Sequence, residues 1–332
     1  MKKVFIAILA AAAFAACNKA EVVESAPAAK IAFDNPFIDN ATKAATDFTK
    51  ANLKNFGVYG SVENTSGLGV IFDNVEVTES NGVYTYSPAQ YWVGGATYNF
   101  TAFAPSANQH WSYTTTDAKN GTITFDNASA AGEQDFLFAS AARTTGESIT
   151  TAPEAVAFTF NHMLSRVKFT FTNGFAAGSN IGLKVTDVTI TNAHKSGELA
   201  VTNGVVADAW TVTANTTDAN VFSRLFGDLN KEKLAEGDNG STAHYYLIPA
   251  EAAYKVTFNI EIFQAGVSVD KYARTAVVDL DMKYGNSYNV KATLNHLNTS
   301  DDGELYPIEF TVNIVNDWTN WADVDATTTT TY

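Results

Sequence analysis

The sequence predicts an all-β protein that follows a short export signal. Short runs rich in Thr, Val, Phe, Tyr and Ile recur along most of the chain, and Gly, Asn and Asp separate them. β-Branched and aromatic residues favour strands, and many short strands with turn residues between them are typical of sandwiches and barrels. Asn-Gly dipeptides at residues 81–82, 120–121 and 203–204 lie beside such runs, where a tight hairpin requires positive φ.

The N-terminus has the pattern of a bacterial lipoprotein signal. Lys2 and Lys3 precede an apolar run over residues 4–16, and Cys17 follows. The run has the length of a secretory signal and is shorter than the roughly 18–20 apolar residues that span a bilayer as a helix. Because Cys17 is the single cysteine of the chain and follows small residues, we expect cleavage between Ala16 and Cys17 and acylation of Cys17 with fatty acids such as palmitate. The alternative is a plain secretion signal with an incidental cysteine.

Composition limits what the rest of the chain can be. The part after Cys17 is longer than one hydrophobic core usually organises, so two domains are expected. Without a second cysteine no disulfide can form within the chain, and 46% hydrophobic content is sufficient for stability by burial. The formal net charge of −14 argues against nucleic-acid binding, which requires clustered Lys and Arg.

The expected organisation follows from composition and periodicity. Residues 1–16 form the signal peptide, and residues 17–30, which are small, polar and acidic, form a tether from the lipid anchor. Residues 31–160 form an N-terminal β-sandwich domain and residues 161–332 a C-terminal one, because comparable sets of strands lie on either side. The expected strands include residues 56–59, 83–86, 97–103, 122–125, 156–160, 167–171, 184–190, 198–202, 245–248, 254–263, 275–280, 287–294 and 308–315.

Two stretches are expected to depart from this pattern. Residues 132–153 are loop-rich apart from the apolar residues 136–138. Residues 221–234 space four apolar side chains roughly as a helix does, although Gly227 interrupts them, so a short helix or an irregular insertion is expected there.

The two ends of the mature chain carry strand-like pieces. Near the start, Ile31 and Phe33 lie in such a piece, and a polar stretch with Lys43, Lys50 and Lys54 follows. Near the end, residues 308–314 alternate apolar and polar without a break, so one face of an extended strand carries Ile308, Phe310, Val312 and Ile314. The simplest interpretation of this last strand is that it closes its own domain.

Catalytic and metal-binding patterns are sparse. The five histidines are scattered, with no pair at a short metal-ligand spacing. Carboxylate pairs such as Asp279 and Asp281 lie on one strand face, whereas glycoside hydrolysis needs two carboxylates facing each other across a cleft. We expect no enzyme activity, no metal and no cofactor.

Four blocks, in this order along the chain, resemble the fimbrillin family of Bacteroidetes surface proteins, whose members build type V pili. They are residues 52–60 (NLKNFGVYG), Tyr91-Trp92 with residues 98–105 (YNFTAFAP), residues 134–139 (QDFLFA) and residues 158–169 (FTFNHMLSRVKF). The resemblance implies two tandem transthyretin-like β-sandwich domains with antiparallel, Greek-key strands. It also implies a lipoprotein precursor and a location at the outer membrane or in a cell-surface fimbrium.

The resemblance further implies an assembly mechanism. Family subunits are cut by an extracellular trypsin-like protease after a basic residue, which removes the first strand with its lipid anchor, and a C-terminal strand of a neighbouring subunit fills the vacated groove. In this chain the removed strand would contain Ile31 and Phe33, the candidate cut sites are Lys43, Lys50 and Lys54, and the donor strand is 308–315. The family pattern cuts after Arg, whereas this stretch contains only lysines.

The partners implied are other fimbrial subunits, either copies of this chain or accessory proteins, and the outer membrane before processing. The alternative roles are a lipid-anchored pilus anchor, a pilus tip, or a surface adhesin that binds a glycan or a host protein. A secreted glycan-degrading enzyme is the remaining and least favoured class.

Overall fold

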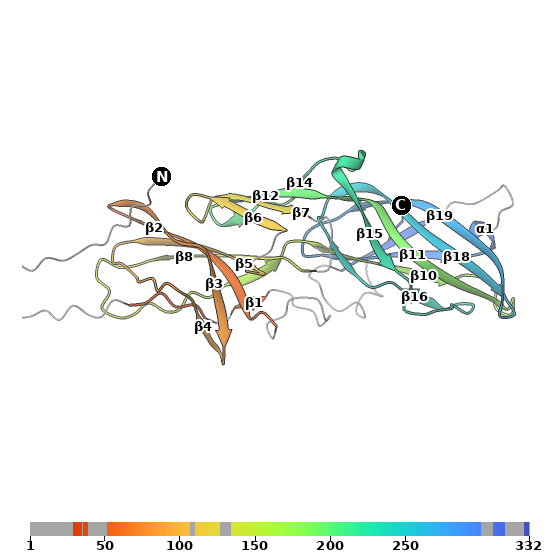
Figure 1. Ribbon diagram of the computed structural model, residues 1–332, viewed down its shortest axis with the longest axis horizontal. Helices are drawn as coiled ribbons and strands as arrows, with labels where there is room; N and C mark the ends of the chain where they lie inside the picture. The colour runs from red at the N-terminus through yellow and green to blue at the C-terminus, as the bar shows by residue number, and fades with distance from the viewer. Residues whose placement is uncertain are drawn as a thin grey trace, which may run out of the picture.

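The computed structural model describes residues 29–34, 36–38, 52–106, 110–126, 134–299, 308–315 and 329–331. Nearly every regular element among these residues is a β-strand; the exceptions are a 3₁₀ turn at Asp218–Asn220 and the short helix α1 (His296–Thr299). The prediction of an all-β fold is therefore confirmed. Figure 1 shows an elongated molecule, with the earlier strands at one end and the later strands at the other.

The first half of the chain is built on a seven-stranded sheet of order β1-β9-β8-β5-β2-β3-β4. Alternation along its central strand β5 separates two cores: Tyr98, Phe100 and Ala102 face one hydrophobic cluster, whereas Phe103 faces another. The strands are β1 (Phe37–Ile38), β2 (Asn55–Asn64), β3 (Gly67–Ser80), β4 (Val83–Thr85), β5 (Thr97–Ala104), β8 (Leu137–Thr144) and β9 (Thr159–His162).

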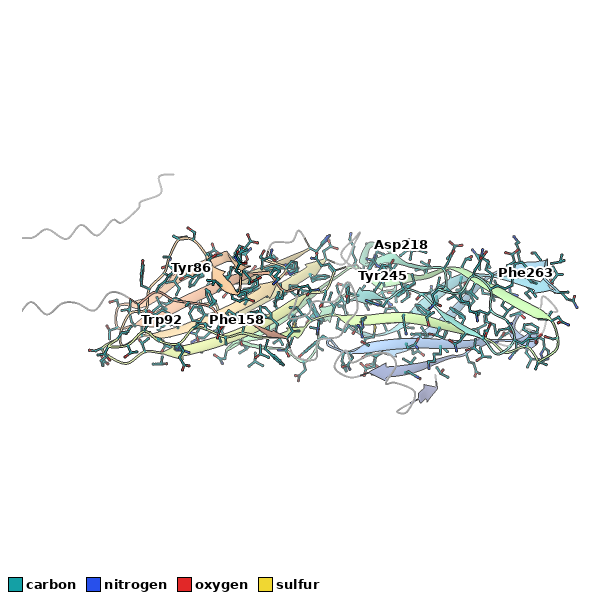
Figure 2. All side chains as sticks on the ribbon, turned by 90° about the horizontal axis from the view of Figure 1, so that it is seen from below. Tyr86, Trp92, Phe158, Asp218, Tyr245 and Phe263 are labelled. Carbon is teal, nitrogen blue, oxygen red and sulfur yellow. The ribbon has the colours of Figure 1, made fainter. Side chains whose placement is uncertain are left out.

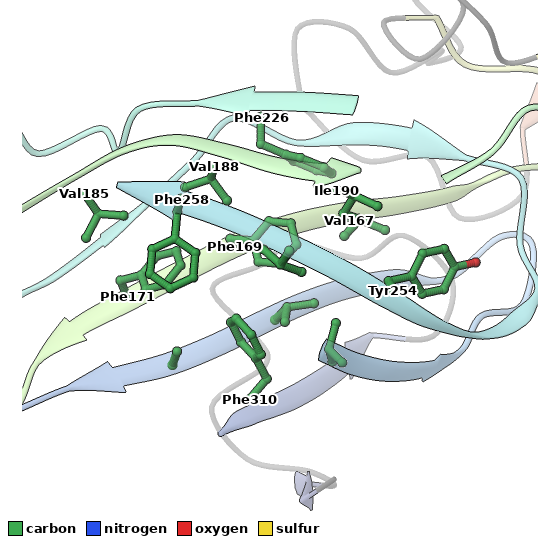
Figure 3. Packing of buried hydrophobic residues seen from close by; sticks show 14 of the residues in the cluster. Val167, Phe169, Phe171, Val185, Val188, Ile190, Phe226, Tyr254, Phe258 and Phe310 are labelled. Carbon is green, nitrogen blue, oxygen red and sulfur yellow. The ribbon is translucent and has the colours of Figure 1, made fainter. Parts of the chain in front are cut away.

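The second half packs two sheets face to face around one large core. The first has the order β16-β10-β20-β21-β22, with β17 also paired to β10, and the second has the order β15-β11-β18-β19. Aromatic and aliphatic side chains of both sheets interdigitate between them (Figure 3). The strands are β10 (Ser165–Asn173), β11 (Ile181–His194), β15 (Val221–Gly227), β16 (Asn239–Ser241), β17 (Tyr245–Leu247), β18 (Glu251–Gln264), β19 (Val267–Asp281), β20 (Ser287–Leu294), β21 (Phe310–Val315) and β22 (Thr329–Thr331).

A fourth sheet contains strands from both halves of the sequence. Strand β6 (Trp111–Thr115) pairs with β7 (Gly121–Asp126), and β7 pairs with β12 (Ser196–Thr202). Strands β13 (Val205–Val206) and β14 (Thr211–Val212), both paired with β12, complete the sheet. A third hydrophobic cluster, to which residues before and after 160 contribute, packs against it. In Figure 1 this sheet lies over the middle of the molecule. The boundary at 160/161 stays a prediction, and the two halves it separates are joined by a continuous ladder between β7 and β12.

Pairing is antiparallel in all described ladders except two. Strands β1 and β9 are parallel, as are β10 and β20. The expectation of purely antiparallel strands is therefore corrected at these places. Parallel neighbours require a long crossover connection, and more than a hundred residues separate the members of each pair.

Two local expectations were wrong. Residues 221–234, expected to form a short helix or an irregular insertion, contain β15, which pairs with β11. Residues 139–144, expected to be a loop, belong to β8, an inner strand of the seven-stranded sheet. Of the three Asn-Gly dipeptides expected at hairpins, two do form turns with positive φ at both residues, at 81–82 and at 203–204. At the third, only Ala118 in the preceding loop has positive φ, and Gly121 begins β7.

Candidate strand-docking site

A short piece of chain near the N-terminus is inserted between two backbone edges of the first half. We call residues 29–34 and 36–38 the N-terminal segment. On one side the amide N–H of Ile31 donates to the carbonyl oxygen of Gln90 at 2.8 Å, and the N–H of Trp92 donates to the carbonyl of Ala29 at 2.9 Å.

The other side of the N-terminal segment is bonded to the run that contains β9. The N–H of Val156 donates to the carbonyl of Ala32 at 2.7 Å, and the N–H of Asp34 donates back to Val156 at 3.0 Å. Further along, the N–H of Phe37 donates to the carbonyl of Phe158 at 2.8 Å, and β1 continues parallel to β9. The segment therefore behaves as an added strand with main-chain partners on both sides.

The apolar side chains of the segment complete the core beneath it. Ile31, Phe33 and Ile38 are 0%, 5% and 2% exposed, and Pro36 is buried as well. The ring of Phe33 packs against five other rings, with centroid separations from 5.4 to 6.3 Å, namely Phe56, Phe72, Tyr86, Phe100 and Phe158. Figure 2 shows Tyr86 and Phe158 in the same half of the molecule. Burying each of these large side chains contributes about 1.5–3 kcal/mol.

Without the N-terminal segment, this part of the fold would be an open groove. Its floor would be the aromatic rings around Phe33, and its two rims would be the backbone of residues 90–92 and 156–160. We call this space the N-terminal groove. Unpaired N–H and C=O groups beside an apolar floor form a template for another extended chain.

Of the three candidate cut sites, the described residues include only Lys54. Its Nζ lies 2.7 Å from Glu79 Oε2 and its side chain is 61% exposed. Its backbone is held, because its carbonyl accepts the N–H of Glu79 at 2.8 Å and β2 begins at the next residue. The preceding side chain, Leu53, is fully buried. Lys43 and Lys50, like Ala16 and Cys17 of the signal, lie outside the described residues.

The candidate donor strand lies in its own half of the molecule, as β21. It pairs antiparallel with β20 over six residues, and β22 pairs with three residues on its outer side. Phe310 and Val312 are 2% and 1% exposed. The ring centroid of Phe310 lies 6.2 Å from that of Phe169 (Figure 3). Ile308 and Ile314, at the two ends of the alternating run, are only half-buried.

The passage between the two halves contains buried polar pairs that sequence reasoning did not find. Nδ1 of His162 lies 2.8 Å from Oδ2 of Asp135, with both side chains buried. Arg166, also buried, donates from Nε to the hydroxyl of Ser287 at 3.0 Å. The partner of the histidine gave no local signal in the sequence, because Asp135 is 27 residues away. These contacts stabilise the place where the chain passes from the first half into the second.

The block of Trp92, Tyr98 and Phe100 contributes to the core, since all three aromatic side chains are buried. Within the described ranges no three His, Cys, Asp or Glu side chains are grouped so that they could hold a metal ion. No helix in the described part of the chain is long and apolar enough to cross a membrane.

Comparison with known proteins identifies the chain's relatives. The sequence profile of the fimbrillin-like family matches residues 42–318. No curated protein matches the chain. Among solved structures, a candidate cell adhesion protein from Parabacteroides distasonis is 10% identical, with 87% of this chain and 97% of that chain covered and a TM-score of 0.51. At this identity the likeness supports the fold alone.

Two further solved structures are similar at lower TM-scores. A candidate cell adhesion protein from Bacteroides uniformis is 16% identical over 88% of this chain and 98% of that one, with a TM-score of 0.46. The fimbrial anchor protein Mfa2 from Porphyromonas gingivalis is 11% identical over 86% and 96%, with a TM-score of 0.39.

The family match covers most of the chain and agrees with the four sequence blocks. The family is one of fimbrial structural proteins and not of enzymes, so it supports a role as a fimbrial subunit or adhesin at the cell surface. The chain belongs to the fimbrillin-like family.

Proposed function

We propose that this protein is a structural subunit of a cell-surface fimbria, a type V pilus, that is exported as a lipoprotein and supports cell adhesion. It assembles by donor-strand exchange after proteolysis removes the N-terminal segment. The observation that carries this proposal is the N-terminal segment itself, whose buried side chains and two-sided main-chain bonds give it the character of a removable strand.

Processing would free the N-terminal groove and release the subunit from its lipid. Cleavage after Lys43 or Lys50 leaves β2 whole and detaches everything from the acylated Cys17 through β1. Cleavage after Lys54 is disfavoured, because a protease binds its substrate as an extended chain and the Lys54 carbonyl is engaged by Glu79. It would also remove the buried side chain of Leu53 from the core.

The strand that fills the groove would come from β21 of a neighbouring subunit. Four apolar side chains on one face supply roughly 6–12 kcal/mol of burial before ordering costs. Two of the four, Phe310 and Val312, are already buried in their own domain, so their burial alone does not favour exchange.

The gain comes from the difference between the two locations. In its own sheet β21 already has main-chain partners on both sides, six residues of β20 and three of β22, so main-chain bonds alone do not favour exchange. In the N-terminal groove a strand has main-chain partners on both rims and covers the rings that surround Phe33. Exchange also buries Ile308 and Ile314, which are half-exposed in the monomer.

The proposal is tested by treating the purified precursor with a trypsin-like protease. We expect loss of the N-terminal segment followed by multimers that resist SDS, because each filled groove joins two subunits through a buried strand. A precursor that is cut before β2 and stays monomeric at high concentration contradicts the proposal.

A lipid-anchored pilus anchor, a pilus tip or an adhesin that binds a glycan or a host protein is the second candidate. The observation that favours it is the absence of arginine between residues 39 and 54, where family subunits are cut after arginine. An anchor would keep the N-terminal segment and its lipid. The intact mass of the protein extracted from cells distinguishes the two roles.

A further inference from the structure

The N-terminal segment and the C-terminal strand share a short pattern. Ile31-Ala32-Phe33 and Ile308-Glu309-Phe310 both place an isoleucine and a phenylalanine two residues apart, on one face of an extended chain. In the N-terminal segment these two side chains are buried, and the residue between them is exposed. Each piece carries two more apolar residues further on: Pro36 and Ile38 in the first, Val312 and Ile314 in the second.

The spacing of those further residues differs by one. Phe33 pairs with Val156 in parallel orientation, and Ile38 pairs with Phe160. Between these two pairs the N-terminal segment advances by five residues, from 33 to 38, whereas its partner advances by four, from 156 to 160. The segment therefore contains one extra residue, as in a β-bulge. In the C-terminal strand, Phe310 and Ile314 are four residues apart.

A regular strand paired with residues 156–160 places its side chains opposite the same partners as the N-terminal segment does. With Phe310 opposite Val156, four further residues place Ile314 opposite Phe160, where Ile38 lies in the precursor. Val312 then lies opposite Phe158. All three partners on the rim are buried, at 4%, 1% and 0% exposure, so all three incoming side chains face the core.

We propose that residues 308–314 of a second copy of this chain enter the N-terminal groove parallel to β9, with Phe310 opposite Val156. Ile308, Phe310, Val312 and Ile314 then occupy the places of Ile31, Phe33, Pro36 and Ile38, in that order. This inference rests on the proposed donor-strand exchange and adds its polarity, its register and its partner. Because one chain carries both the groove and a strand that fits it, copies of this chain can join end to end as a homopolymer.

The same register accounts for the polar residues of the strand. Glu309, Thr311 and Asn313 fall on the opposite face, where the N-terminal segment exposes Ala32, Asp34 and Phe37. Thr311 lies opposite Ala157, which is exposed between the buried Val156 and Phe158.

The register is tested by disulfide cross-linking between subunits. In a Cys17→Ser background, Thr311→Cys is combined with Ala157→Cys, and the matched control combines Thr311→Cys with Thr159→Cys. Adjacent strands hold opposite Cα atoms about 4.8 Å apart, within the roughly 4.4–6.8 Å that a disulfide spans. A two-residue offset places the control pair about 8 Å apart, beyond that range.

After proteolysis and oxidation of the full precursor, we expect a covalent ladder with the Ala157→Cys pair and none with the Thr159→Cys pair. A ladder with Thr159→Cys alone, or SDS-resistant multimers that neither pair cross-links, overturns the register while donor-strand exchange stands. If the processed protein with its natural sequence forms no multimers at all, the proposed function fails together with the inference.

A peptide of residues 308–315 tests the pocket assignment without disturbing the donor's own domain. Binding to the processed protein should weaken on the order of 100-fold when Phe310 is changed to alanine, since the pocket among five rings is left empty. Thr311→Ala in the same peptide should change the dissociation constant by no more than about threefold. Equal effects of the two substitutions contradict the assignment of Phe310 to the Phe33 pocket.

Discussion

His162 Nδ1 and Asp135 Oδ2 lie 2.8 Å apart in the interior, with side chains 2% and 0% exposed. The pair joins the chain just before β8 to the last residue of β9, next to the point where the chain passes into the second half. A buried polar pair of this kind is costly to break from one side, because the remaining partner stays buried without its main interaction. The pair therefore stabilises the crossing between the two halves.

Breaking that pair should destabilise the whole protein. We expect His162→Ala to lower the free energy of unfolding by about 3–5 kcal/mol, measured by urea denaturation. The control is His296→Ala, at an exposed histidine, for which the change should stay within about 0.5 kcal/mol. Similar effects of the two substitutions would show that the buried pair is not a stabilising contact.

The N-terminal segment offers a matched pair of phenylalanines. Phe33 is buried among five rings, whereas Phe37 is 54% exposed. In the uncut precursor, Phe33→Ala should cost about 3–5 kcal/mol of stability, and Phe37→Ala should cost less than about 1 kcal/mol. Thermal and urea unfolding of the two variants measure this difference. If Phe33→Ala lowers the stability no more than Phe37→Ala does, Phe33 is not the anchor of the N-terminal groove.

The environment of Lys168 predicts that the stability of the protein depends on pH. Burial, together with the nearby charges of Arg166 and Lys291, lowers its pKa from 10.5 to about 8. The unfolded chain therefore binds more protons than the folded chain between about pH 8 and 10.5, so this group's contribution to stability rises with pH across that window. Below about pH 8 the cost of its buried charge is fully present.

The corresponding experiment compares natural protein with Lys168→Met. The stability advantage of the substituted protein should be largest near pH 7 and should shrink as the pH rises through about 8 toward 10. Urea midpoints measured at several pH values report it. A difference between the two proteins that does not vary with pH excludes Lys168 as the titrating group.

Charges on the inward face of β21 should stop assembly. Combining Ile308→Asp with Ile314→Asp charges the two half-buried ends of the donor face and keeps Phe310 and Val312 in the variant's own core, so the processed variant should fold but not form multimers by itself. Mixed with processed natural subunits, it should still accept a strand and shorten their multimers by capping one end. Thr311→Asp, on the half-buried outward face, is the control and should assemble. A variant that polymerises despite both charges rules out this strand as the donor.

Much of the fold was predictable because many strands are locally consistent. In β5, aromatic and β-branched residues are frequent, and every residue after Thr97 is buried, as expected of a strand inside the sheet. By contrast, β8 is largely Ala, Ser, Arg and Thr after Phe138, so it carries little strand signal and is defined by its ladder with β5. Whether such a segment forms a strand is decided by its pairing with neighbouring strands and not by its local sequence.

The error at β15 has a specific cause. Leu225 and Phe226 fit a helical spacing with the later leucines, but in the structure they alternate as a strand does: Leu225 is 54% exposed and Phe226 is buried. The strand ends at Gly227, whose φ of +81° suits glycine. Leu229 and Leu234 reach the same core from the loop that follows, so the helical spacing was a coincidence.

The docking site itself was only half predictable. The alternation of residues 308–314 and the strand-like character of Ile31 and Phe33 are visible in the sequence. The rims of the N-terminal groove are not, because Gln90 and Val156 are distant from the segment in sequence and from each other. The sheet shared by β7 and β12 was missed for the same reason.

The most direct test of the account is the N-terminal residue of the subunits in fimbriae sheared from the cell surface. Cleavage before β2, as proposed, predicts that they begin immediately after Lys43 or Lys50 and carry no acyl chain. Fimbrial subunits that still begin at an acylated Cys17 would show that the N-terminal segment stays in its groove, and donor-strand exchange at this site would be contradicted.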